Sequence, residues 1–223
     1  MRHRSKINDS LLSFVLLATL LSIPVAASDD GTGSPGERLN TLLSSIKTIR
    51  ASFSQITHDS GNRSLQENQG RLWFEGPAKF LIETDPPFAQ LLVSDGNSFW
   101  SYDEDLLQVV IRNLEHDIKQ VPILLLGGDA GKLTDDFDVS YFQDERVEYY
   151  LLVPKGTDSL FESLSIEFLE QAPLAITIVD GLGQRTRIEL DEVTVNETIE
   201  SSRFQFEPPP GVDVIDDRAP VHN

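Results

Sequence analysis

Alternating apolar and polar residues dominate the chain from about residue 49 to residue 190. Ile49, Ala51 and Phe53 alternate with polar neighbours, which is the period of a half-buried strand. The most informative stretch is Gln90–Val110, where two runs with large apolar residues flank the tight-turn triplet Asp95–Asn97. This stretch has no histidine and no metal-ligand spacing, which favours a sheet that holds something apolar over one that performs chemistry.

The same pattern predicts a mainly β protein with a few helices. About eleven short antiparallel strands are expected, at residues 49–55, 65–75, 78–84, 91–94, 98–102, 107–112, 137–142, 149–153, 164–169, 175–179 and 186–190, with a last short one starting at Phe204. Leu39, Leu42, Leu43 and Ile46 recur at helical spacing after a start at Ser34. So long a set of strands has to curl to bury its apolar face.

The middle of the chain differs from both flanks. Residues 114–120 predict a short helix, and Pro122 can start another helical turn over the apolar residues 123–126, which Gly127-Gly128 ends. This apolar plug fits either a buried core helix or a cover over a cavity. The pattern alone favours the core.

Residues 1–27 have the form of an export signal. A basic start precedes an apolar run from Leu11 to Val25, and small residues at 25–27 suit a signal peptidase. We expect cleavage after Ala27 and a single domain over residues 28–223, since the run is short for a bilayer span of about 20 residues. The alternative is a retained membrane anchor. The expected location is the periplasm.

Charge and cysteine content narrow the function further. The 36 acidic against 18 basic residues give a net charge of −18, which disfavours binding to nucleic acid or anionic lipid. The charge fits a solubility device or an electrostatic docking surface. The absence of cysteine excludes disulfides and attachment of lipid to a cysteine at the cleavage site.

The search for catalytic and metal-binding patterns is negative. His58, His116 and His222 lie far apart, and the acidic clusters at 103–105 and 135–138 lack the spacing of a calcium loop. A carboxylate pair for glycoside hydrolysis stays open, because no pair is selected by the sequence. We therefore predict no enzyme activity, no metal and no cofactor. An aromatic stripe fits an ordinary core or a cavity for an apolar ligand: Phe53, Trp73, Phe74, Phe80, Phe99, Trp100 and Tyr102.

A family resemblance decides between these alternatives. The pieces that carry it are Ala51-Ser52-Phe53-Ser54-Gln55, Gln66-x-x-Gln69-Gly70-x-Leu72-Trp73, Pro77-x-Lys79-Phe80, Leu92-Val93-Ser94-Asp95-Gly96-x-x-x-Trp100-x-Tyr102, Leu107-Gln108-Val109, Pro122 with its apolar run, Leu152-Val153-Pro154-Lys155, Asp180-x-x-Gly183-Gln184 and Phe204-x-Phe206-x-Pro208-Pro209-x-Gly211-Val212-Asp213. In this order and spacing the chain resembles the periplasmic outer-membrane lipoprotein carriers of the LolA family, over about residues 37–217.

The resemblance implies a single antiparallel sheet curled into an unclosed β-barrel with a helical lid over its mouth. It also implies a soluble, monomeric carrier that takes lipoproteins from an inner-membrane ABC transporter, shields their acyl chains and passes them to an outer-membrane receptor. The lipid-binding residues would be Leu43, Phe53, Leu72, Phe74, Phe80, Ile82 and Leu92, with Ile123, Leu124 and Leu126 in the lid. The similar receptor family is the nearest rival, but it needs a cysteine at the mature start.

One position departs from the family pattern. Many members have an arginine just before the proline of Gly76-Pro77, where it bonds the lid's carbonyls and holds the lid shut. Gly76 cannot do this, so another residue must serve or closure is looser. Two other function classes stay open: a protein-binding envelope-stress regulator on the same curved sheet, and a hydrolase with an unrecognised carboxylate pair.

Overall fold

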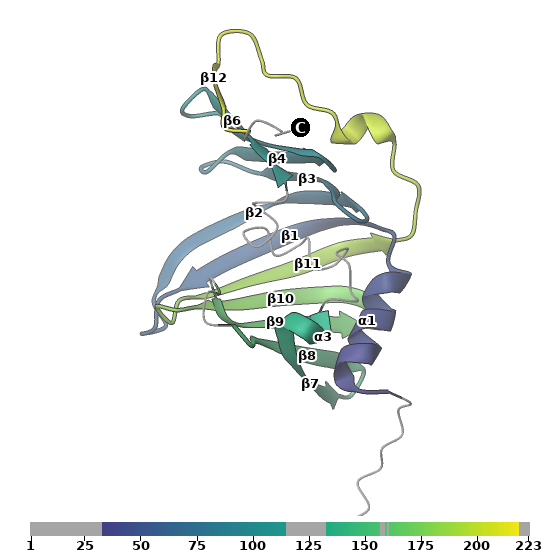
Figure 1. Cartoon of the computed structure of the whole chain (residues 1–223). Helices are drawn as coiled ribbons and strands as arrows, with labels where there is room; N and C mark the ends of the chain where they lie inside the picture. The colour runs from purple at the N-terminus through teal and green to yellow at the C-terminus, as the bar shows by residue number, and fades with distance from the viewer. Residues whose placement is uncertain (1–32, 115–132, 157–158, 160, 219–223) are drawn as a thin grey trace, which may run out of the picture. The chain divides into compact units, whose positions relative to one another are not determined.

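A computed structural model describes residues 33–114, 133–156, 159 and 161–218. Within the unit that starts at Gly33, twelve strands form one sheet in the order β12-β6-β5-β4-β3-β2-β1-β11-β10-β9-β8-β7 (Figure 1). The two end strands do not pair with each other, so the curled sheet is unclosed. The strands are β1 (Thr48–His58), β2 (Ser64–Glu75), β3 (Lys79–Thr84), β4 (Gln90–Asp95), β5 (Ser98–Asp103), β6 (Gln108–Asn113), β7 (Phe137–Asp144), β8 (Val147–Pro154), β9 (Phe161–Leu169), β10 (Ala172–Asp180), β11 (Arg185–Val195) and β12 (Asp213–Asp216).

The predicted fold class is confirmed, with one strand misplaced. Phe204 does not start a strand; it ends the 3₁₀ helix η4 (Ser201–Phe204). The last strand is β12, which pairs in parallel with β6, whereas every other pair in the sheet is antiparallel. All four residues of β12 are exposed, so no alternation marked it in the sequence.

Short side-chain contacts fix the tight turns of the meander. The carboxylate of Asp95 accepts bonds from the N–H groups of Asn97 and Ser98, at 2.8 and 2.9 Å. Gly96 between them has a φ of +100°, a conformation that residues with a Cβ rarely adopt. Asp180 repeats the arrangement between β10 and β11. These turns set the strand register, which keeps each apolar row on one face.

Helix α1 (Pro35–Ser45) begins as the sequence predicts. The hydroxyl of Ser34 accepts a bond from the Glu37 N–H, and the Glu37 carboxylate accepts one from the Ser34 N–H, which together form a capping box. At the other end, Asn196 donates to the carbonyl of Ser45 at 3.0 Å and accepts from the N–H of Lys47 at 2.7 Å. Asn196 thereby ties the end of α1 to the end of β11.

The sheet has an apolar inner face and a partly covered outer face. We call inner the face on which Leu39 and Leu43 of α1 and Leu133 of the short helix α3 (Leu133–Asp136) join the buried cluster. The opposite, outer face carries a smaller cluster on β2 to β5. Residues 196–212, which we call the strap, connect β11 to β12 at the far edge of the sheet and bury Phe204 in that smaller cluster (Figure 1).

Candidate apolar binding site

The residues that the sequence predicts to bind lipid, as far as the structure describes them, all lie on the inner face. Five are buried, with at most 7% of their surface exposed: Leu43, Phe53, Leu72, Phe74 and Phe80. Ile82 and Leu92 are partly buried and pack against the same cluster. Ile123, Leu124 and Leu126 lie outside the described residues, as does the predicted apolar helix that contains them.

Strand register explains why these residues meet. Leu72 on β2 lies opposite Ile82 on β3, which lies opposite Leu92 on β4. Directly paired residues share a face, so the three form a continuous row across the sheet. A second row runs from Phe74 through Phe80 to Ser94. Ser94 is fully buried, and its hydroxyl accepts a bond from the Gly96 N–H at 3.1 Å, so its oxygen is satisfied locally.

Gly70 allows Phe53 to lie flat across the sheet. The two residues are opposite each other on β1 and β2. A Cβ on Gly70 would lie 2.9 Å from two ring carbons of Phe53 and 1.9 Å from the carbonyl oxygen of Glu83. The aromatic ring therefore occupies the space that a side chain at Gly70 would need.

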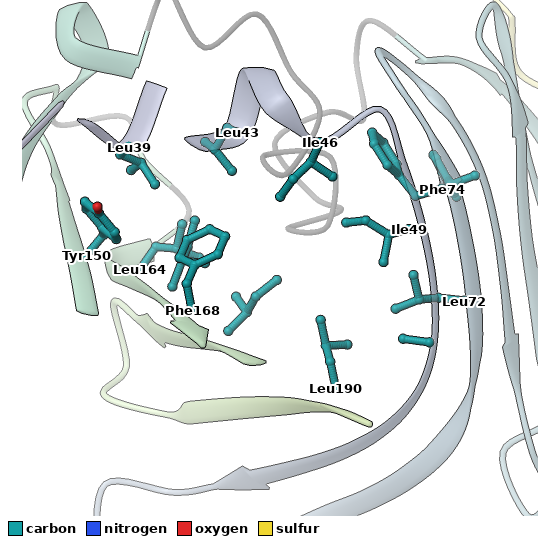
Figure 2. Packing of buried hydrophobic residues seen from close by; sticks show 14 of the residues in the cluster. Leu39, Leu43, Ile46, Ile49, Leu72, Phe74, Tyr150, Leu164, Phe168 and Leu190 are labelled. Carbon is teal, nitrogen blue, oxygen red and sulfur yellow. The ribbon is translucent and has the colours of Figure 1, made fainter. Parts of the chain in front are cut away.

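The other half of the inner face was missed by the sequence prediction. Figure 2 shows Tyr150, Leu164 and Phe168 pointing toward the same interior as Ile49, Leu72 and Leu190, with residues of α1 above them. The alternation of Leu164, Ile166 and Phe168 on β9 was a usable signal for these positions. β8 gave none, because it is apolar at successive positions.

The predicted aromatic stripe is divided between the two faces. Phe53, Phe74, Phe80 and Phe99 belong to the inner cluster, with the rings of Phe80 and Phe99 5.9 Å apart; Trp73 and Trp100 pack on the outer face with Phe204 and Phe206 of the strap. Trp73 alternates with Leu72 and Phe74, so its outward direction follows from the strand period. The prediction that these aromatic residues line one common face is therefore wrong.

Comparison with known proteins shows which family has this sequence. The family model of the outer membrane lipoprotein carrier protein LolA matches residues 44–207. The chain belongs to the LolA family. An outer-membrane lipoprotein carrier protein of Chromohalobacter salexigens is 40% identical over 199 residues, which cover 89% of this chain and 94% of that protein. The Pseudomonas aeruginosa PAO1 carrier is 39% identical over 198 residues, again 89% and 94% of the two chains.

A solved structure agrees on the fold. An uncharacterized conserved protein from Thermus thermophilus superposes with a TM-score of 0.51 at 16% identity, covering 82% of this chain and 96% of that one. At this identity the likeness concerns the fold alone. The LolA family consists of carriers rather than enzymes, in line with the absence of a catalytic pattern in the sequence.

The corner at Gly76, where the resemblance led us to expect an arginine latch, is held by the main chain. The Gly76 N–H donates to the carbonyl of Lys47 at 2.8 Å, and Lys47 follows directly after α1. The beginning of the helix is held elsewhere. The guanidinium of Arg38 lies 4.2 Å from the ring centroid of Tyr141 on β7 and donates to its hydroxyl at 3.2 Å.

Next to this contact lies a polar end of the inner cluster. The ring of Tyr150 packs 5.2 Å from that of Tyr141, and its hydroxyl donates to Glu148 at 2.8 Å. Burial and the bond to the Glu148 carboxylate raise the pKa of Tyr150, so its hydroxyl stays protonated and remains a donor. α1 is thus fixed at one end by Asn196 and at the other by Arg38.

The outer face of β9 to β11 carries charged side chains. Arg187 donates to both carboxylate oxygens of the buried Glu167, at 2.5 and 3.1 Å, and these bonds raise the pKa of Arg187. Two open pockets lie on this face, of about 280 Å³ beside Trp73 and about 440 Å³ beside Arg187. Among the described residues no cluster of histidines or carboxylates could hold a metal ion, and no described helix is long and apolar enough to cross a bilayer.

Proposed function

We propose that this protein carries outer-membrane lipoproteins through the periplasm as a soluble monomer. It accepts them from an inner-membrane ABC transporter, shields their acyl chains on the inner face and delivers them to an outer-membrane receptor. Its relatives are named as outer-membrane lipoprotein carriers. The observation that carries the proposal is the composition of the inner face, where nearly every buried side chain is apolar.

The inner face offers apolar surface for burial and few polar groups that could orient a ligand. Among the described residues the buried side chains with a hydroxyl or a carboxylate are Ser94, Glu167 and Tyr150; Glu167 lies on the outer face, and the Tyr150 hydroxyl already donates to Glu148. Ser94 is already bonded within its own turn. A ligand there gains from burial of its methylene groups, so affinity follows chain length and is indifferent to the attached protein.

The energy scale makes such a carrier necessary. Each methylene hidden from water gains about 0.8 kcal/mol, so a few long acyl chains expose on the order of 30 kcal/mol in the periplasm. No protein attached to such chains crosses water unaided. A carrier does not have to exceed the bilayer's affinity; it has to hide enough chain for transit and still release it.

The apolar burial of α1 is small enough for an acyl chain to offset. The helix buries Leu39 and Leu43 in the inner cluster, and Ile46 follows at its end. Exposing three such side chains costs roughly 5–9 kcal/mol, at about 1.5–3 kcal/mol each. At about 0.8 kcal/mol per methylene, some ten methylenes offset this. One long acyl chain therefore offsets the loss of this apolar burial, whereas a short one does not; displacing the helix also has to break the contacts of Asn196 and Arg38 at its two ends.

The acidic surface would serve the transfer steps. With a net charge of −18, the protein is attracted over several ångströms to a basic face of the transporter. Loading rates should then fall steeply as salt rises from about 0.05 to about 0.5 M, because the Debye length shrinks. Loading rates that do not change with salt would mean that the negative charge serves only to keep the protein soluble.

The proposal is tested by what the protein carries. Protein purified from the periplasm should hold triacylated protein, detected by mass spectrometry, and the Ile82→Asp variant should be secreted, folded and empty. Leu106→Asp is the control, since Leu106 is 69% exposed in the β5–β6 turn. Equal loading of the Ile82→Asp variant contradicts the site. A protein partner without lipid would favour a regulator, and turnover of glycan or lipid esters a hydrolase.

A further inference from the structure

Strand β8 is apolar on both faces, and only one face has a cover among the described residues. Tyr150 and Leu152 point into the inner cluster and are at most 1% exposed. Leu151 and Val153, which alternate with them, are 43% and 41% exposed on the outer face. A strand that is apolar on both faces is typical of a sheet that is covered on both sides.

The exposed side chains form one continuous patch. Tyr149 lies two residues before Leu151 on the same face, and its ring packs 5.2 Å from that of Phe142, its partner on β7. Phe142 is 60% exposed. We call Phe142, Tyr149, Leu151 and Val153 the outer patch. It differs from the apolar cluster on β2 to β5, which the strap covers with Phe204 and Phe206.

The outer patch borders an open strand edge. β7 is the last strand in the sheet order, and no described strand pairs with its other side. Its eight residues pair with β8 without a register shift, and they include no proline and no lysine. Proline, lysine and bulges are the usual means by which proteins block such edges. β7 therefore offers a regular row of backbone donors and acceptors to an added strand.

The charges around the patch define the partner. Asp138 lies directly opposite Val153, with its carboxylate 3.9 Å from the ammonium of Lys155 but still exposed, and Asp144 follows Phe142 by two residues on the same strand. Arg146, in the next turn, is already paired with Glu170 at 2.6 Å. The whole chain adds a net charge of −18. A second copy of this chain would bring the same acidic edge and the same net charge, so like-charge repulsion opposes self-pairing.

We propose that the open edge of β7 and the outer patch together bind an extended, basic segment of another protein. The segment adds to the sheet beside β7, places alternate apolar side chains on the outer patch and sets its lysines or arginines against Asp138 and Asp144. This surface lies on the opposite face from the inner cluster, so it is a docking surface separate from the proposed acyl site.

A synthetic peptide with the sequence Lys-Lys-Val-Thr-Val-Thr-Val-Lys-Lys tests the proposal on the full mature protein. Its binding should slow hydrogen exchange of the β7 amides that do not bond β8 by at least tenfold, measured by NMR. The same peptide with glutamate for lysine, or with proline for the central valine, should leave exchange unchanged. Leu151→Asp should weaken binding by at least tenfold, and Phe142→Ser is the second variant if the first does not fold. Leu106→Asp, remote in the strand order, should bind normally.

Several outcomes overturn the proposal. Equal binding of the glutamate peptide would show that the site does not prefer a basic partner. Normal binding by both patch variants would show that the outer patch is not the site. A concentration-dependent dimer that Leu151→Asp dissociates makes a second copy the occupant. Slow exchange, without peptide, of the β7 amides that do not bond β8 would mean that another segment of this chain already covers the edge. Binding of acyl probes should be unchanged in Leu151→Asp, so that this docking surface and the acyl site are tested independently.

Discussion

Leu91 and Leu92 are neighbours on β4, and their side chains lie on opposite faces of the sheet. Both are partly buried, but Leu92 packs against the inner cluster and Leu91 against the outer cluster under the strap. The same substitution at these two positions makes nearly the same chemical change. Comparing Leu91→Asp with Leu92→Asp therefore separates a loss of acyl binding from a general loss of stability.

The expected magnitudes follow from what each side chain contacts. Either variant gives up about 1.5–3 kcal/mol of apolar burial and should lose a similar amount of unfolding free energy, measured by urea titration. In Leu92→Asp the carboxylate also faces the acyl chain, and the bound chain removes water from it. We expect a 10- to 100-fold loss of affinity, equivalent to about 1.4–2.8 kcal/mol.

The assay is titration with a fluorescent fatty-acid probe, followed by transfer of a triacylated peptide. Leu91→Asp should bind both within twofold of the unsubstituted protein. Equal losses in the two variants would mean that binding tracks stability. A larger loss in Leu91→Asp would place the acyl chains under the strap and refute the assignment of the faces.

Three further outcomes are expected elsewhere in the molecule. Gly70→Ala should lose about 3 kcal/mol or more in urea titration, because the added methyl meets the backbone oxygen of Glu83 at 1.9 Å and β2 must part from β3; a loss below about 0.5 kcal/mol contradicts this packing. Asn196→Ala should cost about 1–3 kcal/mol and speed hydrogen exchange at the end of α1, whereas unchanged exchange there would deny the tie to β11. Bonds from Arg218 lower the pKa of Asp216 to about 2, so this pair stabilises the β12 end above the ordinary carboxyl pKa and loses that effect as the pH falls through about 2; a titration midpoint near 4 by NMR, or one that Arg218→Ala does not raise, contradicts the pair.

Period and turn chemistry were sufficient for most of the fold. The alternation of β1 and β2 placed Phe53 and Phe74 on the buried face, and Ser34 marked the start of α1. Asp95-Gly96 fixed a hairpin that the structure contains. These features are local, since each depends on residues within a few positions along the chain.

The failures concern features that depend on distant segments. β12 forms because the N–H groups of Asp213 and Asp217 donate to carbonyls of Leu107 and Ile111, about a hundred residues earlier. Its two apolar residues, Val214 and Ile215, are adjacent and exposed, so no alternation marks the strand. Phe204 was taken for a strand residue because it alternates with Phe206. Its burial against β2 to β5 stabilises a 3₁₀ turn of the strap instead. On β8 the inner-facing residues Tyr150 and Leu152 were missed, because adjacent apolar residues hide the period.

Family membership supplied what alternation could not, since a filled core and a ligand-binding face have the same pattern. The structure brings the seven described site residues into one cluster with α1. In the proposed mechanism, lipid binding depends on a difference in free energy between an empty and a loaded state of the protein. The pattern of apolar residues in a sequence does not reveal this free-energy difference.

Photocrosslinking from the acyl chain tests the central claim most directly. A triacylated peptide with a diazirine midway along its acyl chains is loaded onto the purified protein, irradiated, and mapped by mass spectrometry. We predict crosslinks to inner-face residues such as Leu72, Ile82 and Leu92, and none to Trp73 or Leu91. Crosslinks confined to the outer face, or an inner face that stays unlabelled at saturating ligand, would contradict the account.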